Sequence, residues 1–311
     1  MATYQTYTAI GQREDLSDVI YNISPTDTPF MSSVGKGKAT ATYHEWQKDS
    51  LASVNTSNAA VEGATASDAT MSPTVRAGNR TQISQKTVKI SGTLESVDKA
   101  GRKSEKAYQL AKASAEIKRD MEAILLSNQA ASAGNASTAR TLGGLQTWLA
   151  TNGDFGTDGV AGASGTTTRT NGTDRTFTEA ILKTVVAEVY TAGGSPKVLM
   201  VRPNHKQVVS TFAGIAAQRY MAPSDAPTTI VGAADVYLSD FGSISVVPNR
   251  FITDTDVAFI IDPDMASVNY LRPFQTNELA KTGDAEVTQL LAEYTLQVSN
   301  EAGHGIIADL T

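Results

Sequence analysis

Residues 36–95 contain two polar segments of strand-forming sequence, Ala39-Thr40-Ala41-Thr42-Tyr43-His44-Glu45-Trp46 and Thr81-Gln82-Ile83-Ser84-Gln85-Lys86-Thr87-Val88-Lys89-Ile90. Both are rich in β-branched and aromatic residues, which favour strands. Residues 55–69 between them are mostly Ala, Ser, Thr, Asn and Gly, a composition typical of a flexible connection. We therefore expect the two segments to form the arms of a long hairpin with a mobile tip.

Large apolar side chains are scarce in this stretch: they occupy only 11 of the 60 positions. Ordering the backbone costs about 1–2 kcal/mol per residue, so the segment needs contacts with another molecule. This pattern suits an assembly protein better than an enzyme. The candidate intersubunit contacts are Tyr43, Trp46, Ile83 and Val88. For Trp46 the alternative is packing under its own hairpin base, against Ile83 or Val88.

The composition excludes several classes of protein. The chain has 311 residues, enough for two subdomains, and no cysteine, which excludes disulfides and thiolate metal sites. Its net charge is −6, and its cations form no block of the kind used for sequence-specific nucleic-acid recognition. No apolar run reaches the roughly 18 residues of a membrane span, and the first residues lack a signal-peptide pattern. We expect a soluble protein made in the cytoplasm, with no membrane partner.

The rest of the chain mixes helices and strands, which predicts the α+β class. Residues 104–128 carry one apolar stripe at helical spacing, and Thr176-x-x-Glu179 resembles a capping box that opens a second helix. Residues 152–174 are polar and glycine-rich, so we expect a surface loop. A third helix should begin at Pro203, and strands are expected at 198–201, 244–247, 257–261 and 290–298.

The sequence offers no argument for catalysis. His44, His205 and His304 fall in different expected elements, and we expect His304 to make a hydrogen bond at a tight bend. Gly35-Lys36-Gly37-Lys38-Ala39-Thr40 lacks the spacing of a phosphate-binding loop and is interpreted as a flexible basic turn. The aspartates at 254, 256, 262 and 264 are typical of turns at strand ends. We therefore predict no catalytic residue, no cofactor and no metal.

Motifs near both ends of the chain resemble one family. The first are Ile23-Ser24-Pro25-Thr26-Asp27-Thr28-Pro29-Phe30, Val34-Gly35-Lys36 and His44-Glu45-Trp46-Gln47-Lys48-Asp49-Ser50-Leu51. The second are Thr282-Gly283-Asp284-Ala285, Glu293-Tyr294-Thr295-Leu296 and Asn300-Glu301-x-x-His304-Gly305. They are similar to the opening and closing segments of major capsid proteins of tailed bacteriophages, in a podophage-like family with the Hong Kong 97-type fold that encapsulins share.

The resemblance implies a fold with an N-arm, an extended β-hairpin loop, a long spine helix, and peripheral and axial domains. The implied ranges are the arm at 1–35, the extended loop at 36–95, the spine helix and start of the peripheral domain at 96–139, the axial domain at 140–250, and peripheral strands with the C-terminus at 251–311. With about 35 residues before the hairpin, we expect no long scaffolding prodomain.

The function that the resemblance implies is a structural protein of the virion. It would self-assemble as hexamers and pentamers into the icosahedral head of a tailed phage. Expected partners are other copies of the chain, double-stranded DNA bound non-specifically on the inner face, a portal, and separate scaffolding or decoration proteins. The alternatives are an encapsulin-like cellular compartment, an enzyme with its site in the α/β layer at 178–214, and a secreted adhesin.

Overall fold

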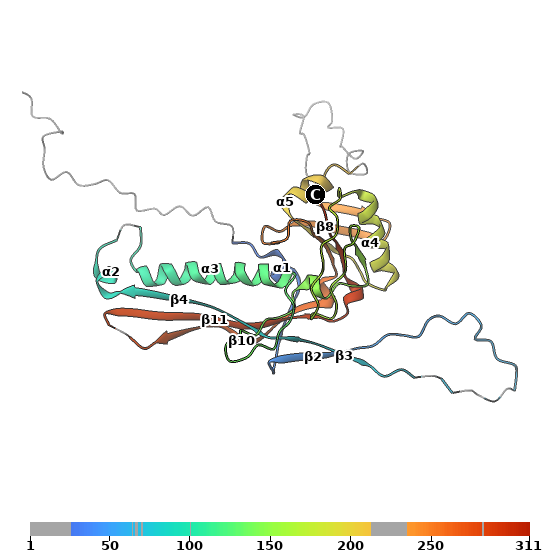
Figure 1. Cartoon of the computed structure of the whole chain (residues 1–311), viewed down its shortest axis with the longest axis horizontal. Coiled ribbons are helices and arrows are strands. Elements are labelled where there is room, and N and C mark those ends of the chain that lie inside the picture. The colour runs from blue at the N-terminus through green and yellow to red at the C-terminus, as the bar shows by residue number, and fades with distance from the viewer. Residues whose placement is uncertain are drawn as a thin grey trace, which may run out of the picture.

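The computed structural model describes residues 26–63, 65, 68–69, 71–99, 101–212, 235–281 and 283–311. The sequence also allows a short helix at 14–21, and this segment lies outside these residues. Figure 1 shows two sheets joined side by side, with a long helix over one of them and a hairpin projecting from the body. Within the described residues, no helix is both long and apolar enough to cross a bilayer.

The first sheet has four strands and carries the long helix. Its order is β1 (Gly35–Lys38), β10 (Ala266–Leu279), β11 (Ala285–Val298), β4 (Gln82–Ser91). Helix α3 (Glu105–Leu126) runs along this sheet beside β4, as the apolar stripe predicts (Figure 1). The Ser104 hydroxyl accepts a hydrogen bond from the backbone N–H of Ala107 and caps the helix. The helix α2 (Gly92–Ser96) connects β4 to this region.

The second sheet has six strands, in the order β5 (Gly153–Asp154), β12 (Gly305–Ile307), β9 (Ala258–Ile261), β6 (Val198–Val201), β8 (Gly242–Pro248), β7 (Val236–Ser239). Helices α4 (Glu179–Thr191) and α5 (Pro203–Val209) accompany it. The expected helices and strands in this part are confirmed, although Thr178, and not Thr176, caps α4. The strands within 251–311, the range expected for the peripheral domain, belong to two sheets: β10 and β11 to the first, and β9 and β12 to the second.

Two hydrophobic cores lie on opposite faces of the six-stranded sheet. Met200 and Phe259 face the first core, which also takes Met121 of α3 and Tyr294 of β11. Leu199 and its alternating neighbours face the second core, under α4. Because β6 is covered on both faces, all four of its residues are apolar and buried. The first core therefore connects the two sheets.

The projecting hairpin differs from the sequence prediction. β2 (Tyr43–Lys48) pairs with β3 (Val75–Arg80), while the segment at 81–90 forms β4 and pairs with β11. The prediction that 39–46 and 81–90 pair with each other was wrong. Residues 43–46 and 82–90 do form strands, but β4 pairs over ten residues with the long strand β11 and lies beside α3, so it belongs to the four-stranded sheet and not to the hairpin.

Three short segments also differ from expectation. Gly35–Lys38 is not a basic turn but the edge strand β1, parallel to β10. The prolines at 25 and 29 favour extended or turn conformations, but Pro29 instead opens the short helix α1 (Pro29–Ser33). Residues 152–174 are not simply a surface loop, because Arg169 within them is 4% exposed. The remaining short helices are 3₁₀ turns at Leu145–Thr147, Pro263–Met265 and Glu301–Gly303.

Candidate functional site

The connection between β2 and β3, residues 49–74, is the most unusual surface of the molecule, and we call it the extended loop. Figure 1 shows it reaching away from both sheets. Its large apolar side chains are almost fully exposed: Leu51 is 99%, Val54 93%, Val61 80% and Met71 90% accessible. No core of the subunit takes up these four side chains, so they are available for contact with another molecule.

The base of the hairpin, in contrast, is fixed to the body. Asn79 of β3 is completely buried; its side-chain amide donates to the backbone oxygens of Gly143 and Leu296, at 3.0 and 2.8 Å. Its side-chain oxygen accepts a hydrogen bond from the Gly143 N–H at 2.8 Å. On β2, His44 Nε2 lies 3.0 Å from Oε1 of Gln297. The extended loop therefore projects from a rigid support.

Trp46 lies on the inner face of β2, against its own subunit. Its ring centroid is 5.4 Å from that of Trp148, and it packs on the first core. Its indole N–H is buried without a hydrogen-bond partner in the described residues. Trp46 therefore packs within its own chain, where its ring lies against Trp148.

The other three candidate contacts are on different faces. Tyr43 lies on the outer face of β2, 40% exposed, with the Arg80 guanidinium 4.6 Å above its ring. Ile83 is 45% exposed on β4, while Val88 packs against the first core. The structure does not bring the four together as one patch. Tyr43 and Ile83 remain available to a neighbour.

Sequence reasoning missed Leu51, Val54, Val61 and Met71 as contacts. It treated the few apolar residues of the loop only as a sign of a poor core. The available signal was the presence of large apolar side chains in a polar segment that cannot form a core of its own, because such side chains gain free energy when another surface removes them from water.

The histidines do not converge. His304 Nδ1 accepts a hydrogen bond from the Asp262 N–H at 3.2 Å at the end of a 3₁₀ turn, which confirms its structural role at a bend. His205 lies under Phe177, and burial lowers the pKa of both His205 and His304. Across the described ranges, His, Asp and Glu side chains form no group of three that could hold a metal ion.

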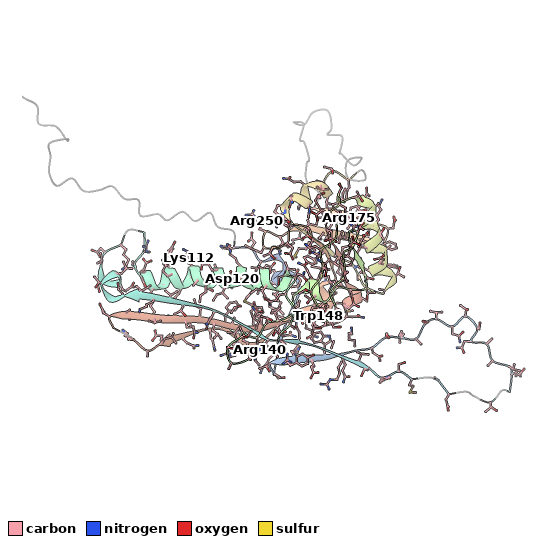
Figure 2. The ribbon with its side chains drawn as sticks, in the orientation of Figure 1. Lys112, Asp120, Arg140, Trp148, Arg175 and Arg250 are labelled. Atoms are coloured by element: carbon pink, nitrogen blue, oxygen red, sulfur yellow. The ribbon has the colours of Figure 1, made fainter. Side chains whose placement is uncertain are left out.

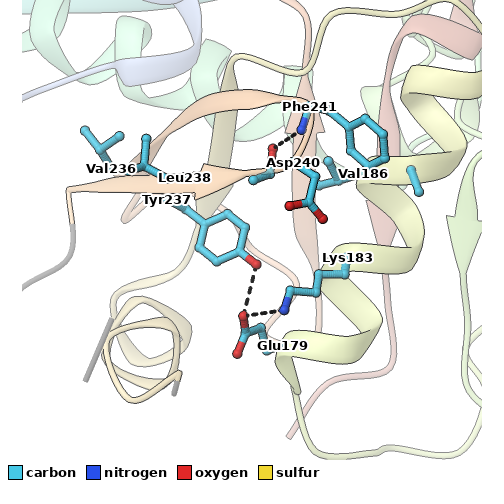
Figure 3. Close-up of a pocket in the computed structure, with 10 residues that line it drawn as sticks. Glu179, Lys183, Val186, Val236, Tyr237, Leu238, Asp240 and Phe241 are labelled. Carbon is cyan, nitrogen blue, oxygen red and sulfur yellow. Dashed lines mark hydrogen bonds and ion pairs between the residues drawn. The ribbon is translucent and has the colours of Figure 1, made fainter. Parts of the chain in front are cut away.

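A pocket of about 680 Å³ lies between α4 and β7, in the region considered for an enzyme site (Figure 3). The Tyr237 hydroxyl donates to Glu179 Oε1 at 3.2 Å, and Lys183 pairs with the same oxygen at 2.9 Å. Burial, together with the Glu179 carboxylate, raises the pKa of Tyr237 to about 12. A phenol with so high a pKa stays protonated near neutral pH, so it supplies neither a phenolate base nor a ready proton donor, and the charges of Glu179 and Lys183 pair with each other.

Comparisons with known proteins agree on one class. The family model described as SU10 major capsid protein matches residues 2–311. The chain is 30% identical to the major capsid protein of Escherichia phage Phieco32 over 98% of this chain and 96% of that one. Among solved structures, the capsid of cyanophage A-1(L) superposes with a TM-score of 0.70 at 13% identity, over 96% of this chain and 97% of that one.

More distant structures share the fold. The capsid of a native GTA particle gives a TM-score of 0.62 at 13% identity, covering 98% of this chain and 97% of that one. The SrpI encapsulin from Synechococcus elongatus gives 0.58 at 9% identity, covering 100% and 96%. At these identities the likeness concerns the fold alone.

Proposed function

The chain belongs to the SU10 major capsid protein family and is a major capsid protein of a tailed phage, and from this premise we propose that it builds an icosahedral head from hexamers and pentamers of itself. Its fold is the Hong Kong 97-type capsid fold, and it is a component of the virion. The observation that supports the proposed assembly is the extended loop, with four exposed apolar side chains on a rigid base.

The extended loop serves as an intersubunit clamp in this proposal. Leu51, Val54, Val61 and Met71 would each be removed from water by a neighbouring copy. At about 25 cal/mol per Å² of apolar area, such contacts become strong only when repeated around a closed ring. Tyr43 and Ile83, which are exposed on different faces, would make separate contacts with neighbouring copies, and Trp46 would hold the base of the loop in place.

The two sheets supply the two domains of the fold. We assign α3 with the four-stranded sheet to the peripheral domain, and the six-stranded sheet with α4 and α5 to the axial domain. The finer partners belong to the same proposal: double-stranded DNA enclosed by the shell, a portal, and scaffolding or decoration proteins. We also propose that the protein has no catalytic activity, since its family is structural. The encapsulin likeness is distant, so a phage head is favoured over a cellular compartment.

The experiment shortens the clamp without touching its support. Replacing residues 49–74 by Asn-Gly joins Lys48 to Val75, which are paired residues of β2 and β3, through a two-residue hairpin turn. The deletion must spare β3, because Asn79 is buried. We expect the free subunit to keep its denaturation midpoint, since the deleted residues contribute nothing to the core, and negative-stain images to show no shells.

A second variant tests the apolar side chains separately from the length of the loop. Leu51, Val54, Val61 and Met71 are all changed to Ser, and the matched control changes four polar loop residues to Ala: Ser53, Thr56, Asn58 and Ser72. We expect the first variant to lose shells and the control to keep them. Normal shells from both the shortened chain and the four-serine variant would refute the clamp.

A further inference from the structure

The charged side chains of α3 are distributed unevenly around the helix. Its four carboxylates all have partners or lie inside: Glu105 pairs with Arg102, Glu116 and Asp120 pair with Lys86 at 2.9 and 3.2 Å, and Glu122 is completely buried. Among the cations, Lys106 pairs with Glu278 and Glu286, at 3.0 and 3.1 Å. The other cations of the helix are Lys112, Lys118 and Arg119.

These three cations have no ion-pair partner among the described residues. Lys112 and Arg119 are seven positions apart, so they share one face of the helix. Ile117 and Met121 on the opposite side are buried in the first core. The Nε of Arg119 is covered and has no hydrogen-bond partner in the described chain. Glu116 lies between Lys112 and Arg119 on this side, and the charges of both cations act on it. Glu116 and Asp120 also pair with Lys86. With Lys86 counted, the four cations Lys86, Lys112, Lys118 and Arg119 exceed these two carboxylates, so the outer side of α3 keeps a net positive charge.

Two neighbouring segments extend the charge. The Arg119 guanidinium lies 5.4 Å from the ring centre of Phe251, next to the exposed Arg250. Lys118 lines a shallow depression of about 430 Å³ together with Lys36 of β1. Figure 2 shows Lys112 along α3 and Arg250 above the C-terminal end of the helix.

We call Lys36, Lys112, Lys118, Arg119 and Arg250 the basic face. Asp27, just before α1, adds one exposed carboxylate near it. We propose that the basic face binds the phosphate backbone of the double-stranded DNA that the shell encloses. This inference rests on the proposed function.

The geometry suits a diffuse polyanion. Lys112 and Arg119 are about 10 Å apart along the helix, and long side chains on a convex helix can each approach a separate phosphate. Cations with no carboxylate partner need not break an ion pair before they bind. The net charge of −6 does not oppose this, because negative charge lies elsewhere: the extended loop carries Asp49, Glu62 and Asp68 and no cation. Binding of this kind is independent of base sequence and weakens steeply with salt.

The test measures binding of the full-length protein to a short fluorescent duplex of mixed sequence, between about 50 and 200 mM salt. The basic-face variant is Lys112→Gln, Lys118→Gln, Arg250→Gln, which leaves Arg119 over Phe251. The control is Lys48→Gln, Lys89→Gln, Lys103→Gln, which removes the same charge from cations that also lack ion pairs in the described structure. Shell formation is followed by electron microscopy for every variant.

Each phosphate contact contributes about 0.9 to the slope of log affinity against log salt. We expect the slope to fall by about 2 to 3 in the basic-face variant, to stay unchanged in the control, and shells to form in both. Equal slopes in the two variants would overturn the inference while leaving the capsid function intact. Loss of shells by the basic-face variant with unchanged duplex binding would instead identify the basic face as a contact between copies. Absence of this chain from the shell of the phage particle would count against the proposed function itself.

Discussion

Glu122 is a single carboxylate that joins three parts of the chain. It lies on α3, accepts the backbone N–H groups of Phe30 and Met31 at 2.6 and 2.9 Å, and accepts the side-chain amide of Asn249 at 2.7 Å. These bonds attach the end of the N-arm and the segment after β8 to the long helix. Burial nevertheless raises its pKa above the ordinary value of 4.5, against the effect of the three donors.

The variant Glu122→Gln should therefore change both stability and its pH dependence. Gln has one acceptor oxygen, so a buried N–H loses its partner, and we expect unfolding to become easier by about 1–3 kcal/mol. A raised carboxyl pKa means that the folded state binds the proton more tightly than the unfolded chain, so this term stabilises the fold as pH falls through the raised pKa toward 4.5. The wild-type advantage over Glu122→Gln should grow as pH decreases, measured by denaturant titration. An advantage that shrinks over that range would contradict the raised pKa.

Trp46 packs within its own subunit, so its substitution should act on the stability of the free subunit. Its indole packs on Trp148 within the subunit, so Trp46→Ala should lower the unfolding free energy of the free subunit by about 2–3 kcal/mol, less than for a fully buried Trp. Ile83 is exposed, and Ile83→Ser should leave the free subunit within about 0.5 kcal/mol of wild type. Chemical denaturation of free subunits and of assembled shells separates an effect on the stability of the subunit from an effect on the stability of the shell. A Trp46→Ala subunit as stable as wild type would show that its packing contributes little.

At the scale of elements, the sequence allowed the strands and helices to be predicted better than their partners. The stripe of α3 and the apolar run of β6 depend on local periodicity, and both predictions are confirmed. The pairing of β4 depends on β11, about two hundred residues away in the chain, which local patterns do not encode. β1 was missed because Gly and Lys alternate there, and it exists as a strand through its parallel partner β10.

The candidate site followed the same division. The need for an outside partner could be predicted from composition, since 49–74 has too few apolar residues for a core. The direction in which each side chain points could not be predicted from composition. Trp46 faces inward and Tyr43 faces outward on β2, and this follows only from the pairing of β2 with its partner strand.

A buried cluster of ion pairs fixes the segment 152–174 to the body. The glycine-rich composition of this segment had predicted a surface loop. Arg169 pairs with Asp309 at 2.9 Å and with Asp256 at 3.0 Å, and its own side chain is 1% exposed. Arg169→Ala leaves two carboxylates without their cation, so we expect a loss of about 3–5 kcal/mol. The control is Arg175→Ala, whose pair with Asp154 is partly solvated and should contribute about 1 kcal/mol or less. Thermal denaturation of both variants measures these losses of stability. Equal losses in the two variants would rule out a special role for the buried cluster.

The whole molecule combines a continuous interior with a detached loop, which separates folding from assembly. Its first core takes side chains from both sheets, so neither sheet can lose its packing without exposing the other. The described residues of the extended loop contribute nothing to either core. Changes in the loop should therefore act on the shell, whereas changes in the cores should act on the subunit.

We expect the described body to unfold in one cooperative step. Both tryptophans, Trp46 and Trp148, pack on the first core, so their fluorescence reports on the part that joins the sheets, while circular dichroism reports on all helices and strands. Leu182 of α4 is completely buried in the second core, whereas both tryptophans pack on the first core. Leu182→Ala should cost about 2–5 kcal/mol. If the sheets are coupled through β6, this variant shifts the fluorescence and dichroism midpoints equally; a shift in dichroism alone would show that the six-stranded sheet unfolds independently.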